Sequence, residues 1–142
     1  MNNDEILKGL NAIGQGHLPG LMGIEILAVE EGSLLSRLPV RPELMAPNGY
    51  LHAGTVTTLA DTTSGYGTMA NLPDGAFGFT TIELKCNFLG SIQEGMLYCR
   101  ATPVHLGRTT QVWDARVYIE ERDKTLAMFR CTQMLLYPET GK

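Results

Sequence analysis

The run AGTVTTLADTTSGYGTMA, residues 53–70, decides the fold of this 142-residue chain. It lacks the strict alternation of a strand, and the spacing of Val56, Leu59 and Thr63 fits a helix. Its residues are small and uncharged except for Asp61, and its many Thr and Gly are poor helix formers. Such a helix is stable only when other elements bury it, so we expect a sheet to wrap around it.

The segment before this helix predicts a short helix and two strands. Residues 3–13 can form an amphipathic helix, with Asn3 or Asp4 as its cap. Gly and Pro residues then break the chain up to residue 20. Residues 24–29 and 34–40 favour two strands joined by a tight turn at Glu31-Gly32, and a loop follows over residues 42–49.

The segment after the helix predicts four strands. A turn cluster at residues 71–75 comes first. The strands are expected within residues 80–88, 93–104, 113–119 and 125–137. Their connections are short, and short connections predict that consecutive strands are antiparallel neighbours.

The order of elements predicts an α+β fold, in which an antiparallel sheet curls around one long central helix. This is the layout of the hotdog fold. The length favours a single domain over residues 1–142, with residues 1–20 as an N-terminal helix and loop.

Composition excludes several classes of function. The net charge is -4 and the Lys and Arg residues form no cluster, which argues against a nucleic-acid partner. No apolar stretch reaches the roughly 18 residues that span a membrane, and residues 1–10 do not form a signal peptide. Charged residues make up 18% of the chain, against about 25% in typical domains, which points to surface hidden in a homo-oligomer.

The three cysteines predict a location rather than a metal site. Cys86, Cys99 and Cys131 lack the spacing of metal ligands, and each lies in an apolar, strand-like run. They are expected to be buried small residues in a reducing compartment, so the cytoplasm is the predicted location. No metal or cofactor is expected.

Asp61 is the strongest candidate for a functional residue. A carboxylate inside an apolar helix is costly to bury unless it is bonded, exposed in a cleft or present for its reactivity. The structural interpretation is a bond to Thr57, Thr58 or Ser64. The functional interpretation is a catalytic carboxylate, and the residues just upstream favour it.

The stretch before the helix predicts where a substrate carbonyl lies. A helix start exposes free N–H groups that can stabilise a developing oxyanion, and small residues at Ala53 and Gly54 allow close approach. Asp61 lies eight residues further on, roughly 12 Å along the axis, which is too far to meet the same carbonyl within one chain. The spacing therefore predicts a site shared between two subunits with antiparallel helices.

The same stretch resembles a known family. LHAGTVTTLADTTSGYG (51–67) is similar to the motif of phenylacetate-degradation-type and 4-hydroxybenzoyl-CoA hotdog thioesterases, in which a carboxylate stands nine positions after the His of His-Gly-Gly. FTTIELKCNFLGSIQEG (79–95) and VHLGRTTQVWDARVY (104–118) resemble the following strand and hairpin, and the resemblance covers residues 20–137. It implies hydrolysis of an acyl-CoA, with a small aryl or medium-chain acyl group, by a dimer or a dimer of dimers without a cofactor.

The resemblance also implies roles for individual residues. Asp61 is the nucleophile or the general base, and the Ala53 N–H polarises the carbonyl. Thr81 helps to place water, with Thr80 as the alternative if the alignment shifts by one residue. Asn48 lies near the position of an Asn that contacts the carbonyl or acyl group in relatives.

The chain departs from the family pattern at two of these positions. Ala53 replaces the first Gly of the motif, and Asn48 stands four positions before His52, closer than usual. A non-catalytic acyl-CoA-binding protein would explain the same departures and is the alternative function. A hotdog dehydratase is disfavoured because its His-containing motif is not found.

The remaining polar candidates have more than one interpretation. His52 is expected to orient the loop and lie near the substrate with Gly54, rather than to catalyse. His17 and His105 stand alone and suggest no metal site. Gly107 and Arg108 lie in a hairpin turn, which is either plain solvated turn or a contact for the CoA phosphates.

Overall fold

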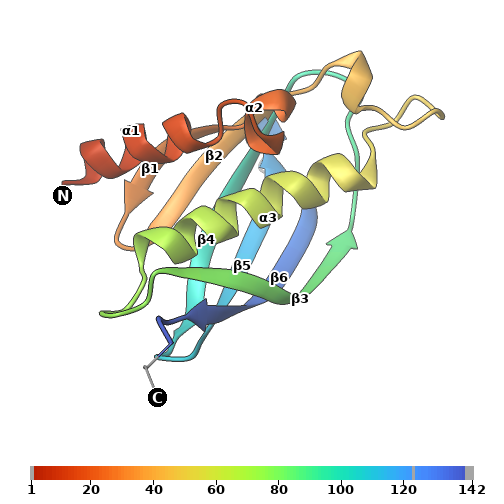
Figure 1. Cartoon of the computed structure of the whole chain (residues 1–142). Helices are drawn as coiled ribbons and strands as arrows, with labels where there is room; N and C mark the ends of the chain where they lie inside the picture. Colours follow the sequence, from red (N-terminus) through yellow and green to blue (C-terminus); the bar gives the residue numbers. More distant parts are fainter. Residues whose placement is uncertain (1, 123, 140–142) are drawn as a thin grey trace.

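A computed structural model shows a long helix lying across one face of a curved, six-stranded antiparallel sheet (Figure 1). The structure describes residues 2–122 and 124–139, so residues 1, 123 and 140–142 of the predicted domain lie outside it. The arrangement confirms the predicted α+β fold, with the sheet wrapped around the helix.

The helices and strands follow the predicted order, with one helix added. The helices are α1 (Asn3–Ile13), α2 (Leu18–Met22) and α3 (Ala53–Ala70), with 3-10 turns η1 (Pro42–Leu44) and η2 (Glu120–Arg122). The strands are β1 (Glu25–Glu30), β2 (Ser33–Pro39), β3 (Gly78–Phe88), β4 (Met96–Leu106), β5 (Thr110–Ile119) and β6 (Lys124–Leu136).

The bounds of α1 match the prediction, but its cap residue does not. Asn2 is the cap, not Asn3 or Asp4, because its side chain accepts from the Glu5 N–H at 2.9 Å and the Glu5 carboxylate accepts from the Asn2 N–H at 3.2 Å. This reciprocal pair needs an acidic residue three positions after the cap. Asn3 instead donates to the Val29 carbonyl at 3.0 Å and ties α1 to β1.

The Gly- and Pro-rich segment after α1 contains a short helix that the sequence analysis missed. Pro19 lies in the first turn of α2, where its missing N–H costs no hydrogen bond. Gly23 ends α2 in the left-handed conformation, with φ at 82°. The same two residue types that break a long helix thus delimit a five-residue one.

The strand order corrects one predicted pairing. The sheet runs β1-β2-β4-β5-β6-β3, so β3 pairs with β6 at the edge and not with β4, which follows it in sequence. The short connection around residues 90–94 therefore crosses the sheet instead of forming a hairpin. The hairpins predicted for β1–β2, β4–β5 and β5–β6 are all present.

Burial in the sheet stabilises α3 in spite of its composition. Leu59, Ala60 and Thr63 are fully buried. The Thr63 hydroxyl lies 2.7 Å from both the Leu59 carbonyl and the Ser36 hydroxyl, so this buried polar group is satisfied. Gly67 lets the helix approach the ring of Trp113, since a Cβ there would lie 2.5 Å from it.

A bulge in β3 changes which side chains face the helix. The register against β6 shifts between Thr81 and Glu83, so Phe79 and Thr81 face α3 before the bulge, as Cys86 does after it. Uniform alternation would instead have placed Thr80 with Cys86. Thr80 is exposed, and Thr81 points inward.

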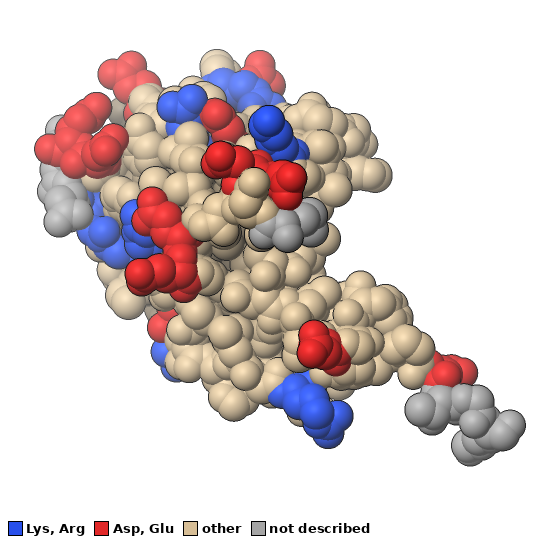
Figure 2. Space-filling view, turned by 90° about the vertical axis from the view of Figure 1, so that its left-hand side faces the viewer, with Lys and Arg blue, Asp and Glu red and all other residues tan. Residues whose placement is uncertain are grey.

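The outer surface carries charges of both signs. On the face shown in Figure 2, acidic and basic side chains are interspersed over the upper part of the molecule, and much of the rest is neutral. No helix among the described residues has the length and apolar character needed to cross a membrane.

Candidate active site

The start of α3 presents one free backbone donor. His52 is the cap, and its Nδ1 accepts from the Gly54 N–H at 2.7 Å. The Thr55 and Val56 N–H groups donate to the His52 carbonyl at 2.9 and 3.3 Å. Among the described residues, the Ala53 N–H has no acceptor, so it is available to a ligand.

The His52 side chain therefore caps the start of α3. Because Nδ1 accepts a hydrogen bond, the proton of the neutral imidazole is on Nε2. A Cβ at Gly54 would lie 2.9 Å from His52 Nδ1, so a glycine is needed for the imidazole to cap the helix.

Asp61 has an unsatisfied buried oxygen. Its Oδ1 is buried and has no hydrogen-bond partner among the described residues. Burial raises the pKa of this carboxyl above its ordinary value of 3.8. The predicted structural bonds to threonine are absent, since the Thr57 and Thr58 hydroxyls donate to the Ala53 and Gly54 carbonyls.

The side chains beside Asp61 come from the same helix and from β6. Burial and the negative charge of Asp61 together raise the pKa of the Cys131 thiol to about 12, so Asp61 is close enough for its charge to act on this thiol. Ser64, one turn after Asp61, faces the same thiol and slightly opposes that rise. Its buried Oγ nevertheless has no partner with hydrogen-bond geometry in the described part of the chain.

Thr81 lies on the same side of the molecule as Asp61. Its hydroxyl donates to Gln133 Oε1 on β6 at 2.6 Å. Gln133 is two residues from Cys131 on the same face of the strand, about 7 Å along it. Thr81 thus lies on the α3 side of the sheet, whereas Thr80 is exposed.

Asn48 lies apart from these groups. It is exposed in the loop before α3, and its Oδ1 accepts from the Tyr50 N–H at 3.1 Å to form a tight turn. Within one chain it shapes the loop that leads to the helix start.

Gly107 and Arg108 lie at the far end of the sheet from the helix start. The Gly107 N–H donates to the Thr110 carbonyl at 2.9 Å and closes the β4–β5 hairpin, and the Arg108 carbonyl accepts from the Tyr137 hydroxyl. The adjoining Gln111 donates to the carbonyl of Asn71, just after α3 ends. The length of α3, about 27 Å, therefore separates Arg108 from Ala53 in the same chain.

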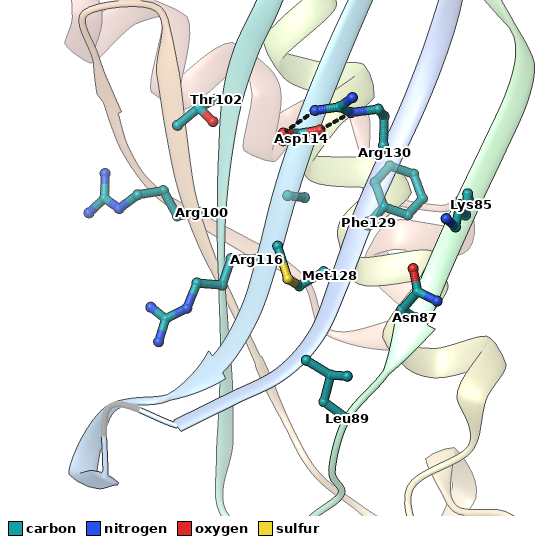
Figure 3. Close-up of a pocket in the computed structure, with 11 residues that line it drawn as sticks. Lys85, Asn87, Leu89, Arg100, Thr102, Asp114, Arg116, Met128, Phe129 and Arg130 are labelled. Carbon is teal, nitrogen blue, oxygen red and sulfur yellow. Dashed lines mark hydrogen bonds and ion pairs between the residues drawn. The ribbon is translucent and has the colours of Figure 1, made fainter.

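The best-formed groove is on the opposite face of the sheet. Figure 3 shows the side chains of Asp114, Met128 and Arg130 on the outer face, with α3 behind the strands. Arg130 and Asp114 form a two-bond ion pair there, at 2.5 and 2.8 Å. The groove, of about 670 Å³, does not include Asp61 among its lining residues. The Asp61 carboxyl, which lies on α3, is therefore not part of this groove.

Two buried polar residues on the α3 side of the sheet have an atom without a partner in the described part of the chain, and only Ser64 was considered from the sequence, as a possible partner of Asp61. Gln133 is fully buried and its Nε2 has no partner among the described residues, and Ser64 Oγ is in the same state. The signal for Gln133 was present, since it occupies an inward position between Phe129 and Leu135 in the alternating pattern of β6.

The fold is that of a hotdog-fold hydrolase, and in its described part Asp61 has a buried carboxyl oxygen without a partner. The family model described as the thioesterase superfamily matches residues 48–126. The 1,4-dihydroxy-2-naphthoyl-CoA hydrolase of Listeria monocytogenes is 34% identical over 78% of this chain and 89% of that protein. The chain therefore belongs to the thioesterase superfamily and is a thioester hydrolase.

Solved structures agree with this assignment. A mutant of thioesterase PA1618 from Pseudomonas aeruginosa superposes with a TM-score of 0.87 and 29% identity, and the match covers 93% of this chain and 94% of that one. The E. coli PaaI protein from the phenylacetic acid degradation operon has a TM-score of 0.79 at 22% identity, over 94% and 95% of the two chains, which shows the shared fold.

Proposed function

We propose that this chain hydrolyses a small aryl- or medium-chain acyl-CoA in a site formed between two subunits, with Asp61 as the essential carboxylate. The observation that carries the proposal is the buried Oδ1 of Asp61, which has no partner among the described residues. An unbonded buried carboxyl oxygen is costly in free energy, and a reaction that uses it accounts for that cost.

The chemistry divides between the two ends of the site. The Ala53 N–H donates to the thioester carbonyl oxygen and stabilises the negative charge that develops there. Asp61 of the facing subunit accepts a proton from water, the water oxygen bonds to the carbonyl carbon, and the C–S bond then breaks. The CoA thiolate takes up the proton, which gives free acid and CoA.

Direct attack by Asp61 is the other route that the arrangement allows. In that route an acyl-Asp61 anhydride forms as CoA leaves, and water then hydrolyses it. Both routes start from the ionised carboxylate. A raised pKa makes that carboxylate a stronger base, which favours the water route.

The substrate class rests on the relatives and on the fold. A relative named for hydrolysis of an aromatic CoA thioester supports an aryl acyl group. The Arg108 guanidinium and the Gly107 turn are far from Ala53 of their own chain, so we assign their contact with CoA phosphates to a substrate held across the subunit boundary. Three unpaired cysteines fit an enzyme of the cytoplasm.

A panel of aryl-, short- and medium-chain acyl-CoA substrates, with detection of free thiol, tests this proposal. We expect hydrolysis by the wild type and a loss of at least about 100-fold in kcat for Asp61→Asn, with the fold unchanged by circular dichroism. Asp74→Asn, at an exposed turn, is the matched control and should keep full activity. Equal rates for Asp61→Asn and the wild type would remove Asp61 from the mechanism.

The same panel separates turnover from binding. A non-catalytic acyl-CoA-binding protein would bind CoA esters, as measured by calorimetry, and would release no thiol from any of them. Membership of a hydrolase family favours turnover in spite of Ala53, because alanine keeps the backbone N–H that the reaction needs.

A further inference from the structure

Gln133 is a buried polar residue for which the mechanism above gives no role. Its side chain is 0% exposed on β6. A buried amide is costly in free energy unless its polar atoms are bonded. Its Oε1 accepts from the Thr81 hydroxyl at 2.6 Å, whereas its Nε2 has no partner among the described residues. Packing alone would be served better by an apolar residue of the same volume.

We propose that Gln133 is a positioning residue for thioester hydrolysis, which holds the hydroxyl proton of Thr81 so that Thr81 Oγ1 acts as an acceptor toward the attacking water. This inference rests on the proposed roles of Asp61 and Thr81.

The hydrogen-bonding capacity of a threonine hydroxyl explains the effect. It has one proton to donate and two lone pairs that accept. With its proton on Gln133 Oε1, Thr81 can offer only lone pairs to the site. A water that donates one proton toward Asp61 and the other to Thr81 directs its own lone pairs at the carbonyl carbon.

Without Gln133 the Thr81 hydroxyl is free to rotate. It could then donate to the Asp61 carboxylate, which would occupy the base and weaken it as a proton acceptor. Gln133 therefore acts on the reaction only through Thr81.

The placement of the residues supports this geometry. Phe79, two residues before Thr81 on β3, lies against Gly65 of α3, one turn after Asp61. The Asp61 charge also acts on Cys131, and Gln133 is the next residue on the same face of β6. Thr81 is directly opposite Gln133 on β3, and the bulge that follows it turns the hydroxyl toward α3.

A second buried glutamine in the same row of the sheet provides a contrast. Gln111 on β5 pairs with Gln133 and is 1% exposed. Its Oε1 accepts from Trp113 Nε1 at 2.8 Å and its Nε2 donates to the Asn71 carbonyl at 2.8 Å. Both of its polar atoms thus serve the fold, which makes it a matched control.

Steady-state kinetics of Gln133→Met, Thr81→Val and the double variant test the proposal, with Thr81→Ser and Gln111→Met as controls. We expect each single variant to lower kcat about tenfold with little change in KM, and the double variant to be no slower than Thr81→Val alone. Thr81→Ser keeps the hydroxyl and should stay near the wild-type rate. Gln111→Met should lower the melting temperature and leave kcat unchanged.

Two outcomes would overturn the proposal. One is a wild-type kcat in folded Gln133→Met, and the other is a double variant whose loss is the product of the single losses, which would mean that Gln133 acts independently of Thr81. If Gln133→Met does not fold, Gln133→Asn replaces it in the experiment. Asparagine is one methylene shorter, so its amide is withdrawn from Thr81. The Asp61→Asn variant tests a different point. If it keeps its activity, the proposed function itself is refuted, whatever the Gln133 variants show.

Discussion

At the scale of the residue, Asp61 is a partly buried carboxyl with one oxygen that has no partner among the described residues. Helix α3 holds it where its charge acts on the Cys131 thiol. Burial without a compensating cation raises its pKa, because desolvation disfavours the charged form. This cost in stability is consistent with selection for chemistry rather than for packing.

The pH dependence of the rate should report this carboxyl. Since the reaction needs ionised Asp61, kcat is expected to fall as the pH is lowered through the raised pKa, and so at a higher pH than for an ordinary Asp at 3.8. A pH–rate profile from about pH 3 to 8 measures the acidic limb. A limb centred at or below 3.8 would contradict the assignment of Asp61 as base.

The stability of the fold should depend on pH in the opposite sense. A carboxyl whose pKa is raised by folding contributes stability that is fully present below its unfolded pKa and is lost as the pH rises through its folded pKa. Melting curves of Asp61→Asn, which cannot ionise, should therefore lack this part of the pH dependence. This control does not rely on substrate.

At the scale of the element, the sequence predicted α3 to the residue and misplaced one strand pairing. The composition of α3 demanded burial, and the structure supplies it through Leu59, Thr63 and Gly67. Alternation located the strands, but the partner of β3 depends on long-range contacts that one strand does not encode. The bulge after Thr81 could not be predicted for the same reason, and it decides which of two adjacent threonines lies on the α3 side of the sheet.

The contact of Gly67 with Trp113 should be sensitive to a single methyl group. An added Cβ would lie 2.5 and 2.6 Å from two ring carbons of Trp113, which is fully buried and held by its bond to Gln111. We expect Gly67→Ala to destabilise the fold by about 1–3 kcal/mol. Urea unfolding followed by Trp113 fluorescence measures the loss.

Gly9 provides the matched control in α1. A Cβ there meets nothing within 4 Å, so Gly9→Ala should stabilise the protein by about 0.5–1 kcal/mol through helix propensity. A stabilising effect of Gly67→Ala of similar size would show that α3 can move away from the sheet, against the tight packing described above.

At the scale of the whole molecule, one chain holds the two halves of the proposed site apart. Ala53 and Asp61 are separated by about 12 Å along α3, and Arg108 lies near the other end of the helix. A second subunit related by a two-fold axis would bring Ala53 of one chain to Asp61 of the other, twice per dimer. The exposed apolar side chains of Leu84 and Phe88 on the β3 edge suit such an interface.

Mixed dimers of two inactive variants test the shared site. Ala53→Pro removes the one N–H that would polarise the carbonyl, and proline is well tolerated at the first position of a helix. The extended backbone of His52, with φ at -66° and ψ at 135°, already suits a residue before proline. We therefore expect Ala53→Pro to be folded and inactive, like Asp61→Asn.

Unfolding the two variants together at equal concentrations and refolding them should restore activity. In a shared site, each mixed dimer has one site with both defects and one site with Ala53 and Asp61 intact. Random pairing makes half of the dimers mixed, so about a quarter of the wild-type rate is expected. If each chain formed its own site, every site would carry one defect and the mixture would stay inactive, so recovery depends on residues from two chains meeting at one carbonyl.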